Sequence, residues 1–219
     1  TTWNTLSCGT QNNINQVFFA DDNTGYLAYG YNGGILKTTD GGSTWTGLVT
    51  GSGRQIRSLF FVDGNHGIAA GDYGTLVKTI DGGTTWTGLP DGSTRDLYSV
   101  FFPSANTGFA VGEKGTILKT HDAGLTWTVL ASGTNMTLNS VFFTDDNTGY
   151  VAGGGHFTDS TWALLKTTDG GATWTDVLGG TFGPLTSVYF TDHNFGYACG
   201  WKGIIKTEDA GASWDPVSG

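Results

Sequence analysis

The sequence predicts an all-β protein, a five-bladed β-propeller whose blades are four-stranded antiparallel sheets. Three observations lead to this prediction. An eight-residue box containing Asp, Gly and Trp occurs five times, an apolar run precedes each copy, and 37 of the 219 residues are glycine. Aromatic residues and charged residues each make up 13% of the chain, a composition typical of short strands joined by tight turns.

The box sets the period of the repeat. Its copies are TTDGGSTW at 38–45, TIDGGTTW at 79–86, THDAGLTW at 120–127, TTDGGATW at 167–174 and TEDAGASW at 207–214. Counted from Trp3, the box tryptophans are spaced by 42, 41, 41, 47 and 40 residues. We therefore expect residues 1–219 to form a single propeller domain. Its repeats are approximately 4–45, 46–86, 87–127, 128–174 and 175–214, and the fourth carries an insertion.

Each repeat is expected to supply four strands in chain order. The first is an apolar run such as INQVFFAD at 14–21, whose aromatic and β-branched residues predict a strand buried on both faces. An Asn-x-Gly turn follows, where the reversal needs positive φ or side-chain support. The second strand carries a small residue that lets neighbouring sheets approach closely. These residues are Ala28, Ala69, Ala110, Ala152 and Ala198.

A variable turn then leads to the third strand, and the box forms a hairpin into the fourth. The third strands share a lysine, which we expect to be structural and to pair with nearby carboxylates: Lys37, Lys78, Lys119, Lys166 and Lys206. The chain begins with a fourth-strand sequence, TTWNTL, and ends with another, ASWDPV. Because Pro216 cannot donate to a strand ladder, we expect the opening segment to complete the last blade; the alternative is a piece of a longer array.

The five boxes match the Asp-box pattern S/T-x-D-x-G-x-T/S-W of sialidase-type propellers. The fuller unit, as in SVFFTDDNTGYVAG followed by LLKTTDGGATW, resembles the repeat of the photosystem II assembly-factor family and its relatives among secreted bacterial proteins. The resemblance covers the whole chain and implies a propeller. It leaves function open, because the same repeat occurs in hydrolases and assembly factors.

The box residues are expected to be structural. The carboxylate before the glycine turn can accept local N–H bonds, and the tryptophan can bury a large apolar area between sheets. A calcium loop is the alternative, but one carboxylate per turn offers too few oxygen ligands. We expect no metal, cofactor or catalytic residue in the boxes. Their residues are Asp40, Trp45, Asp81, Trp86, Asp122, Trp127, Asp169, Trp174, Asp209 and Trp214.

Ligand binding is expected on the opposite face, at the turns between second and third strands. Exposed aromatic rings beside polar groups suit a sugar, and the first-strand positions that align in the repeat but differ in chemistry would line the same face. The candidates are Asn15, Tyr31, Arg57, Tyr73, Tyr98, Asn139, Trp162, Thr186 and Trp201. Other polar or aromatic members of these turns are Asn32, Asp72, Glu113, Lys114, His156, Phe157, Asp159 and Lys202. All three arginines, Arg54, Arg57 and Arg95, fall in blade-to-blade connections, which suggests an anionic group.

These features favour a non-catalytic recognition module, secreted by a bacterium or displayed on its surface, that binds a glycan. The alternatives are a protein-interaction scaffold like the assembly factors and a glycoside hydrolase. A hydrolase would draw its carboxylate pair from Asp72, Asp91, Asp96, Glu113 or Asp159. The net charge of −9 argues against nucleic acid, and no apolar run is long enough to span a membrane. Cys8 and Cys199 are two buried thiols or one pair, and the oligomeric state stays open.

Overall fold

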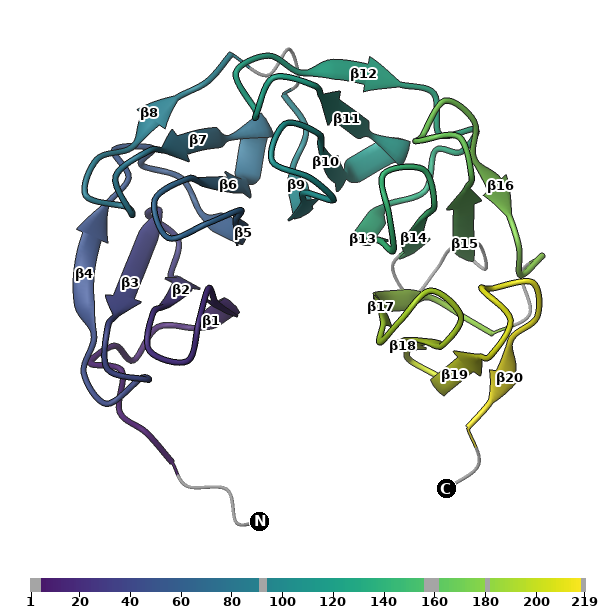
Figure 1. Ribbon diagram of the computed structural model, residues 1–219, viewed down its shortest axis with the longest axis horizontal. Helices are drawn as coiled ribbons and strands as arrows, with labels where there is room; N and C mark the ends of the chain where they lie inside the picture. The colour runs from purple at the N-terminus through teal and green to yellow at the C-terminus, as the bar shows by residue number, and fades with distance from the viewer. Residues whose placement is uncertain (1–4, 91–93, 156–161, 180–181, 218–219) are drawn as a thin grey trace. The chain divides into compact units, whose positions relative to one another are not determined.

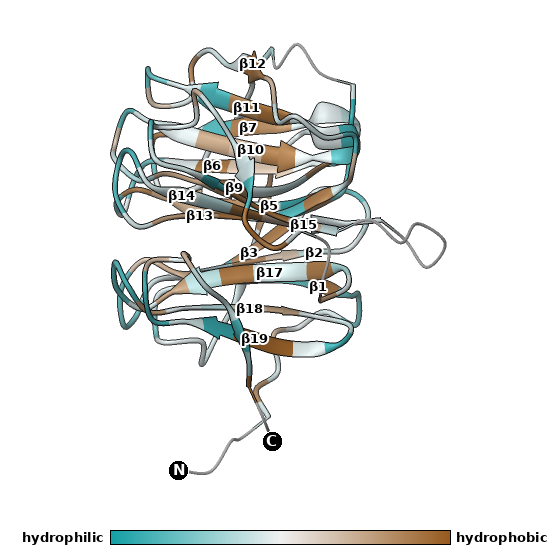
Figure 2. Cartoon of the chain, turned by 90° about the vertical axis from the view of Figure 1, so that its right-hand side faces the viewer, coloured by the Kyte–Doolittle hydropathy of each residue, from teal (hydrophilic) through white to brown (hydrophobic). Residues whose placement is uncertain are grey.

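The computed structural model describes residues 5–90, 94–155, 162–179 and 182–217. Trp3, which marked the start of the repeat, lies outside them. The described residues contain twenty β-strands, which form five antiparallel sheets of four strands each, hydrogen-bonded in chain order (Figure 1). We call these sheets blades 1 to 5. Figure 2 shows hydrophobic residues along strands such as β10 and β17 and hydrophilic residues in the turns at strand ends.

The chain divides into two compact units, Thr1–Thr94 and Arg95–Gly219. The first unit holds blade 1, with β1 (Ile14–Phe19), β2 (Gly25–Tyr29), β3 (Gly34–Thr38) and β4 (Thr46–Val49), and blade 2, with β5 (Ile56–Phe61), β6 (Gly67–Gly71), β7 (Leu76–Thr79) and β8 (Thr87–Gly88).

The second unit holds three blades. Blade 3 contains β9 (Leu97–Phe101), β10 (Gly108–Gly112), β11 (Ile117–Thr120) and β12 (Thr128–Leu130); blade 4 contains β13 (Leu138–Phe143), β14 (Gly149–Gly154), β15 (Trp162–Thr167) and β16 (Thr175–Asp176). Blade 5 contains β17 (Leu185–Phe190), β18 (Gly196–Gly200), β19 (Gly203–Thr207) and β20 (Asp215–Pro216). Two short 3-10 turns, η1 (Asp72–Gly74) and η2 (Glu113–Gly115), follow β6 and β10.

The second strands of blades 2, 3 and 4 are buried throughout, and the first strand differs from expectation. Every residue of β6, β10 and β14 is buried. In β5 the side chains alternate, so that Leu59 and Phe61 are buried while Phe60 is half-exposed. The prediction that the first strand is buried on both faces is therefore wrong. Successive side chains of a strand point to opposite faces. Because the run is apolar at nearly every position, its sequence does not show which of the two faces is buried.

The core repeats one aromatic arrangement. In blade 4 the Phe143 ring is stacked on Phe109 of the preceding blade at a centroid distance of 4.1 Å, and Trp174 of its own box meets it edge-on at 6.0 Å. Both contacts are geometries that aromatic pairs prefer. The box tryptophan thus packs on the first strand of its own blade, and the first strand packs on the preceding blade.

The Asn-x-Gly turns use side-chain support rather than positive φ. Asp145 accepts the N–H groups of Asn147 and Thr148, each at 2.7 Å. Gly149 does not lie in the left-handed region, but a Cβ at this position would come within 2.5 Å of the Phe143 ring. The glycine is therefore required by the ring that lies flat against it.

The last blade takes its fourth strand from the end of the chain. In β20, Asp215 pairs with Lys206 and Pro216 with Ile205, so the prediction that the opening segment fills this position is wrong. Pro216 is tolerated because the next inward-pointing N–H belongs to Val217, which donates to the Ile204 carbonyl at 2.9 Å. The missing N–H of a proline matters little where it would point away from the sheet.

Among the helices of the described residues, none has the length and hydropathy needed to cross a membrane.

Candidate functional site

The Asp-boxes join the third and fourth strands, and each carboxylate is enclosed by hydrogen bonds from its own turn. Asp40 Oδ1 accepts from the Thr38 hydroxyl and the Thr44 N–H, both at 2.8 Å, and Oδ2 accepts from the Thr44 hydroxyl at 2.6 Å. The other four boxes repeat these bonds at Asp81, Asp122, Asp169 and Asp209.

These bonds shift the acidity of the boxes. The strongest contribution is the hydroxyl four residues on, followed by the N–H of the same residue. Together they lower the pKa of Asp40, Asp122, Asp169 and Asp209 to about 2 and lower that of Asp81 as well. The carboxylates are thus held in the charged form by their own turns. In the part of the chain that the structure describes, no three His, Cys, Asp or Glu side chains gather as metal ligands would.

The third-strand lysines join neighbouring blades. Lys37 Nζ donates to the carbonyl of Gly82 in the next box at 2.8 Å, and Lys166 Nζ donates to that of Ala210 at 2.6 Å. Lys119 makes the same bond to Gly170. The expected carboxylate partner is therefore wrong for these three lysines. Lys206 has the expected partner, because its ammonium lies 2.6 Å from Glu208 Oε1.

The turns between second and third strands lie at the other end of the third strand. Tyr73 of η1 and Lys114 of η2 have left-handed backbones, with φ of 54° and 52°. Tyr31, Tyr73 and Trp201 are exposed, and Arg54 stacks over the Tyr73 ring at 4.8 Å. In the second unit the Lys202 ammonium lies 5.3 Å from the centre of the half-buried Trp162 ring. His156, Phe157 and Asp159 lie outside the described residues.

The aligned first-strand candidates mostly bond to other parts of the protein, either in the next blade or in their own blade. Asn15 Nδ2 donates to the Ile56 carbonyl of the next blade at 2.7 Å, and Asn139 makes the same bond to Leu185 at 2.8 Å. Arg57 pairs with Asp72 in the turn of its own blade. Thr186 is exposed and donates to the Cys199 carbonyl at 3.2 Å, while Tyr98 is half-buried. Their amide, guanidinium and hydroxyl groups therefore already have partners within the protein.

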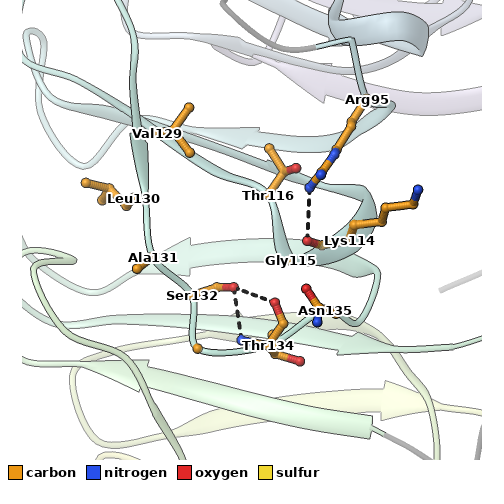
Figure 3. Close-up of a pocket in the computed structure, with 11 residues that line it drawn as sticks. Arg95, Lys114, Gly115, Thr116, Val129, Leu130, Ala131, Ser132, Thr134 and Asn135 are labelled. Atoms are coloured by element: carbon orange, nitrogen blue, oxygen red, sulfur yellow. Dashed lines mark hydrogen bonds between the residues drawn. The ribbon is translucent and has the colours of Figure 1, made fainter.

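A pocket of about 620 Å³ opens at the turn of blade 3 (Figure 3). Arg95 and Lys114 lie on one side of it, and the end of β12 with Val129 and Leu130 lies on the other. Ser132, Gly133 and Thr134 also line it, and the Arg95 guanidinium donates to the Lys114 carbonyl at 3.2 Å. The pocket thus combines two cations, hydroxyl groups and a short apolar strip, and no acidic residue lines it.

A second pocket, of about 600 Å³, occupies the equivalent place in blade 1. It is lined by Asn12, Tyr29, Tyr31 and Asn32 together with Val49 and the glycine-rich segment after β4, and it has no charged lining residue. Of the nine ligand-binding candidates only Tyr31 lines either pocket, and of the other residues named from the sequence Asn32, Lys114 and Arg95 do so. Sequence reasoning missed the segments that follow the fourth strands. The sequence feature that could have identified these segments is the similarity between TGSG at 50–53 and ASGT at 131–134.

Of the carboxylates considered for a hydrolase, the structure describes Asp72, Asp96 and Glu113, and the last two lie side by side through a main-chain hydrogen bond. Asp72 is bound to Arg57, and the Asp96 carbonyl accepts the Glu113 N–H at 2.9 Å. Asp91, like Asp159, lies outside the described residues. Cys8 and Cys199 are both half-buried free thiols.

Comparison with known proteins gives the following likenesses. A family model described as "Photosynthesis system II assembly factor YCF48" matches residues 1–92 and, a second time, residues 89–184. The structure of YCF48 from Cyanidioschyzon merolae is similar with a TM-score of 0.70 and 20% identity, over 94% of this chain and 72% of that one. A structure described as YCF48 bound to D1 peptide is similar with a TM-score of 0.51 and 19% identity, over 93% and 94%. No curated protein matches the chain.

An enzyme has a similar fold. The GH74 enzyme of Niastella koreensis aligns with a TM-score of 0.74 and 20% identity over 92% of this chain, which spans only 38% of that enzyme. At these identities the solved structures show the fold alone. They confirm the predicted fold class, a five-bladed all-β propeller of four-stranded blades with Asp-box turns between third and fourth strands.

Proposed function

Because the chain belongs to the family of the photosynthesis system II assembly factor YCF48, we propose that it is a non-catalytic propeller that binds a peptide segment of a partner protein. The family model covers most of the chain, and a relative in structure is described as bound to a D1 peptide. Both favour protein interaction over the glycan binding expected from the turns.

The observation that carries the proposal is the blade-3 pocket. A peptide offers carboxylates, main-chain amides and apolar side chains, and the pocket has a group for each. The Arg95 guanidinium and the Lys114 ammonium attract a carboxylate, and a guanidinium can hold it through two parallel hydrogen bonds. Val129 lies exposed along the opposite side, where it can cover an apolar side chain.

The charge distribution supports a local docking point. The chain as a whole carries −9, so an acidic peptide is repelled at long range and attracted only where cations gather. Salt screens both effects over about 10 Å. A peptide with a carboxylate at its anchor should therefore depend on Arg95 and Lys114 more than on any other cation of the turns.

The test is calorimetric titration of the 219-residue chain with a D1 peptide. Arg95→Ala should weaken binding by about tenfold or more, since a hydrogen bond to a charged group contributes roughly 1.5–3 kcal/mol. Arg54→Ala is the control: it removes another exposed arginine, which does not line this pocket, and should leave binding unchanged. Absence of binding to the D1 peptide and to an acidic peptide library, or equal loss in both variants, contradicts the proposal.

Glycan binding is a second candidate, favoured by the blade-1 pocket. Tyr29 and Tyr31 beside Asn12 and Asn32, without charge, suit the apolar face and hydroxyl groups of a neutral sugar. Titration with xyloglucan oligosaccharides tests it, with Tyr31→Ala as the variant that should abolish any response. Hydrolysis of the same oligosaccharides would overturn the non-catalytic assignment. Secretion or surface display stays a prediction.

A further inference from the structure

The fourth strand of each blade forms the outer edge of its sheet. Each sheet is ordered from first to fourth strand, so the fourth strand is hydrogen-bonded to the third on its inner side. Along such a strand, one residue directs its N–H and C=O groups to the neighbouring strand and the next residue directs them away from the sheet. The outer edge is therefore a row of main-chain groups with which another extended chain can pair.

The register of the blades shows which residues of the edge point outward. In blades 2, 4 and 5 an inward N–H donates to a third-strand carbonyl at 2.9 Å, and the donors are Leu89, Val177 and Val217. Leu130 of blade 3 and Leu48 of blade 1 hold the same position in their ladders. Their neighbours along the strand therefore point outward. The outward positions are Gly47 and Val49 in blade 1, Gly88 and Pro90 in blade 2, Val129 and Ala131 in blade 3, Asp176 and Leu178 in blade 4, and Pro216 in blade 5.

The edges of blades 2, 4 and 5 are protected against a further strand. Pro90 and Pro216 have no N–H to donate at their outward positions, and proline is a common protection of edge strands. In blade 4 the outward N–H of Leu178 already donates to the Asp176 carboxylate at 3.0 Å. The same carboxylate repels an acidic peptide. Each of these three edges therefore disfavours the addition of a strand.

The edges of blades 1 and 3 carry neither proline nor a charged residue at their outward positions. Their fourth strands are also longer, with four residues in β4 and three in β12, against two in each of the other blades. Each of these two edges runs into one of the pockets described above. Val49 lines the blade-1 pocket, and Val129 and Ala131 line the blade-3 pocket (Figure 3). An unprotected edge and a pocket thus occur together in both blades.

We propose that the partner peptide binds as an added strand on the outer edge of β12, with a carboxylate in the blade-3 pocket. This inference rests on the proposed function and specifies how the peptide is held. The main-chain groups of Val129 and Ala131 pair with the peptide backbone, and Arg95 and Lys114 bind an acidic side chain. Strand addition is a general mode of peptide recognition, in which main-chain bonds give affinity and pockets for alternate side chains give specificity.

Charge complementarity favours β12 over β4 for an acidic peptide. The pocket beside β4 has no charged lining residue, whereas Arg95 and Lys114 line the pocket beside β12 and no acidic residue does. Side chains of an extended peptide alternate between two faces. An acidic residue at the two cations and an apolar residue beside Val129 must therefore lie an even number of positions apart. Moving the acid by one position should turn it to the other face and weaken binding.

A pair of proline variants tests strand addition. Ala131→Pro removes an outward N–H from the β12 edge, and the fold accepts the change because blade 2 carries Pro90 at the equivalent position. Calorimetric titration with the D1 peptide should show binding weakened by about fivefold or more, the loss expected for one main-chain hydrogen bond. Gly47→Pro is the control. It makes the same change at the β4 edge, at the position that Pro216 holds in blade 5, and should leave binding unchanged.

N-methylated D1 peptides test the same pairing with the protein unchanged. Alternate N–H groups of an added strand point to β12 and the intervening ones point to solvent. Methylation at successive positions should therefore weaken binding at every second residue of the bound segment and leave the others unaffected. Circular dichroism confirms that the two proline variants are folded.

The outcomes separate this inference from the proposed function. If Arg95→Ala weakens binding while Ala131→Pro and every N-methylated peptide bind as the unmodified pair does, strand addition is wrong and the proposed function stands. Equal losses in Ala131→Pro and Gly47→Pro also contradict a site on β12. Absence of binding by the wild-type chain, to the D1 peptide and to the acidic peptide library alike, overturns both.

Discussion

The two ends of the third strand differ in how far their chemistry is fixed. At one end, each Asp-box uses its carboxylate, hydroxyl groups and glycine backbone in the same hydrogen bonds, and Thr167 and Asp169 repeat what Thr38 and Asp40 do. At the other end, the turn is closed by main-chain bonds such as that of the Thr116 N–H to the Glu113 carbonyl. Side chains there are left to vary. At the box end of the third strand the side chains are therefore fixed by the hydrogen bonds that stabilise the turn. At the other end the side chains are available to bind a partner.

The largest effect is expected from the aromatic core beneath the boxes. Phe143→Ala removes the ring held between Phe109 and Trp174, and a buried Phe→Ala change costs about 3–5 kcal/mol. Urea unfolding followed by tryptophan fluorescence measures the loss. Val129→Ala, at an exposed position of the binding end, should change stability by less than about 0.5 kcal/mol. Similar losses of stability in the two variants would contradict the proposed difference between the two ends of the third strand.

The next effect concerns a box carboxylate. Asp169→Ala removes the acceptor of the Thr167 hydroxyl and of both donors of Thr173, so the unfolding midpoint should fall clearly. Asp169→Asn should fall less, because the amide oxygen still accepts one of these bonds. Tyr31→Ala at the opposite end should leave the midpoint in place. A midpoint unchanged in Asp169→Ala would show that the turn holds its shape without the carboxylate.

Acid should weaken the boxes as a group. The pKa values of all five box carboxyls are depressed in the folded state, to about 2 for Asp40, Asp122, Asp169 and Asp209, so the unfolded chain binds protons first as pH falls. The stabilisation is present above the ordinary carboxyl value near 4 and is lost as pH falls from about 4 toward 2. Thermal unfolding across this range should show a falling midpoint, with a shallower fall in Asp209→Asn. An equal slope in that variant would assign the acid loss to other carboxylates.

The smallest effect is expected in the turn between the second and third strands of blade 3. There one substitution should raise the stability of the protein and weaken its binding of peptide. Lys114 has φ of 52°, a conformation that costs a non-glycine residue about 1–2 kcal/mol, while glycine adds an entropic cost of roughly 0.5–1 kcal/mol. Lys114→Gly should therefore stabilise the protein slightly, by at most about 1.5 kcal/mol, and weaken peptide binding. Thermal unfolding and calorimetry on one preparation measure both. Weaker stability together with weaker binding would make the lysine structural.

Much of the fold could be predicted because it depends on contacts between residues that are close together in the sequence. The box needs only contacts within eight residues, so TTDGGSTW identifies its hairpin without knowledge of the rest of the chain. The second-strand alanines, such as Ala110, are buried as expected because space between sheets limits their size. The prediction for β20 is wrong because the sequence does not show the direction of the Pro216 backbone nitrogen, which points away from the neighbouring strand.

The site could be predicted only in part, because its contacts cross between segments. Tyr31 was selected for its exposed turn, but Arg95 and Ser132 meet in one pocket only when the segment after β12 passes beside η2. The sequence indicates Asn15 and Asn139 as ligand groups because their aligned position differs in chemistry from repeat to repeat. Their carbonyl partners are more than forty residues away, and sequence spacing alone gives no sign of them.

The bond from the third-strand lysine to the next box has a consequence for how such chains change in number of repeats. The lysine donor and the carbonyl acceptor occupy fixed positions in the repeat. A duplicated segment that runs from one box tryptophan to the next would therefore contain both the lysine that bonds to the following blade and the carbonyl that accepts from the preceding blade. Loss of one unit would let Lys37, for example, meet the box carbonyl two repeats on in place of Gly82. The length of the protein can therefore change by whole repeats without any new interface having to evolve.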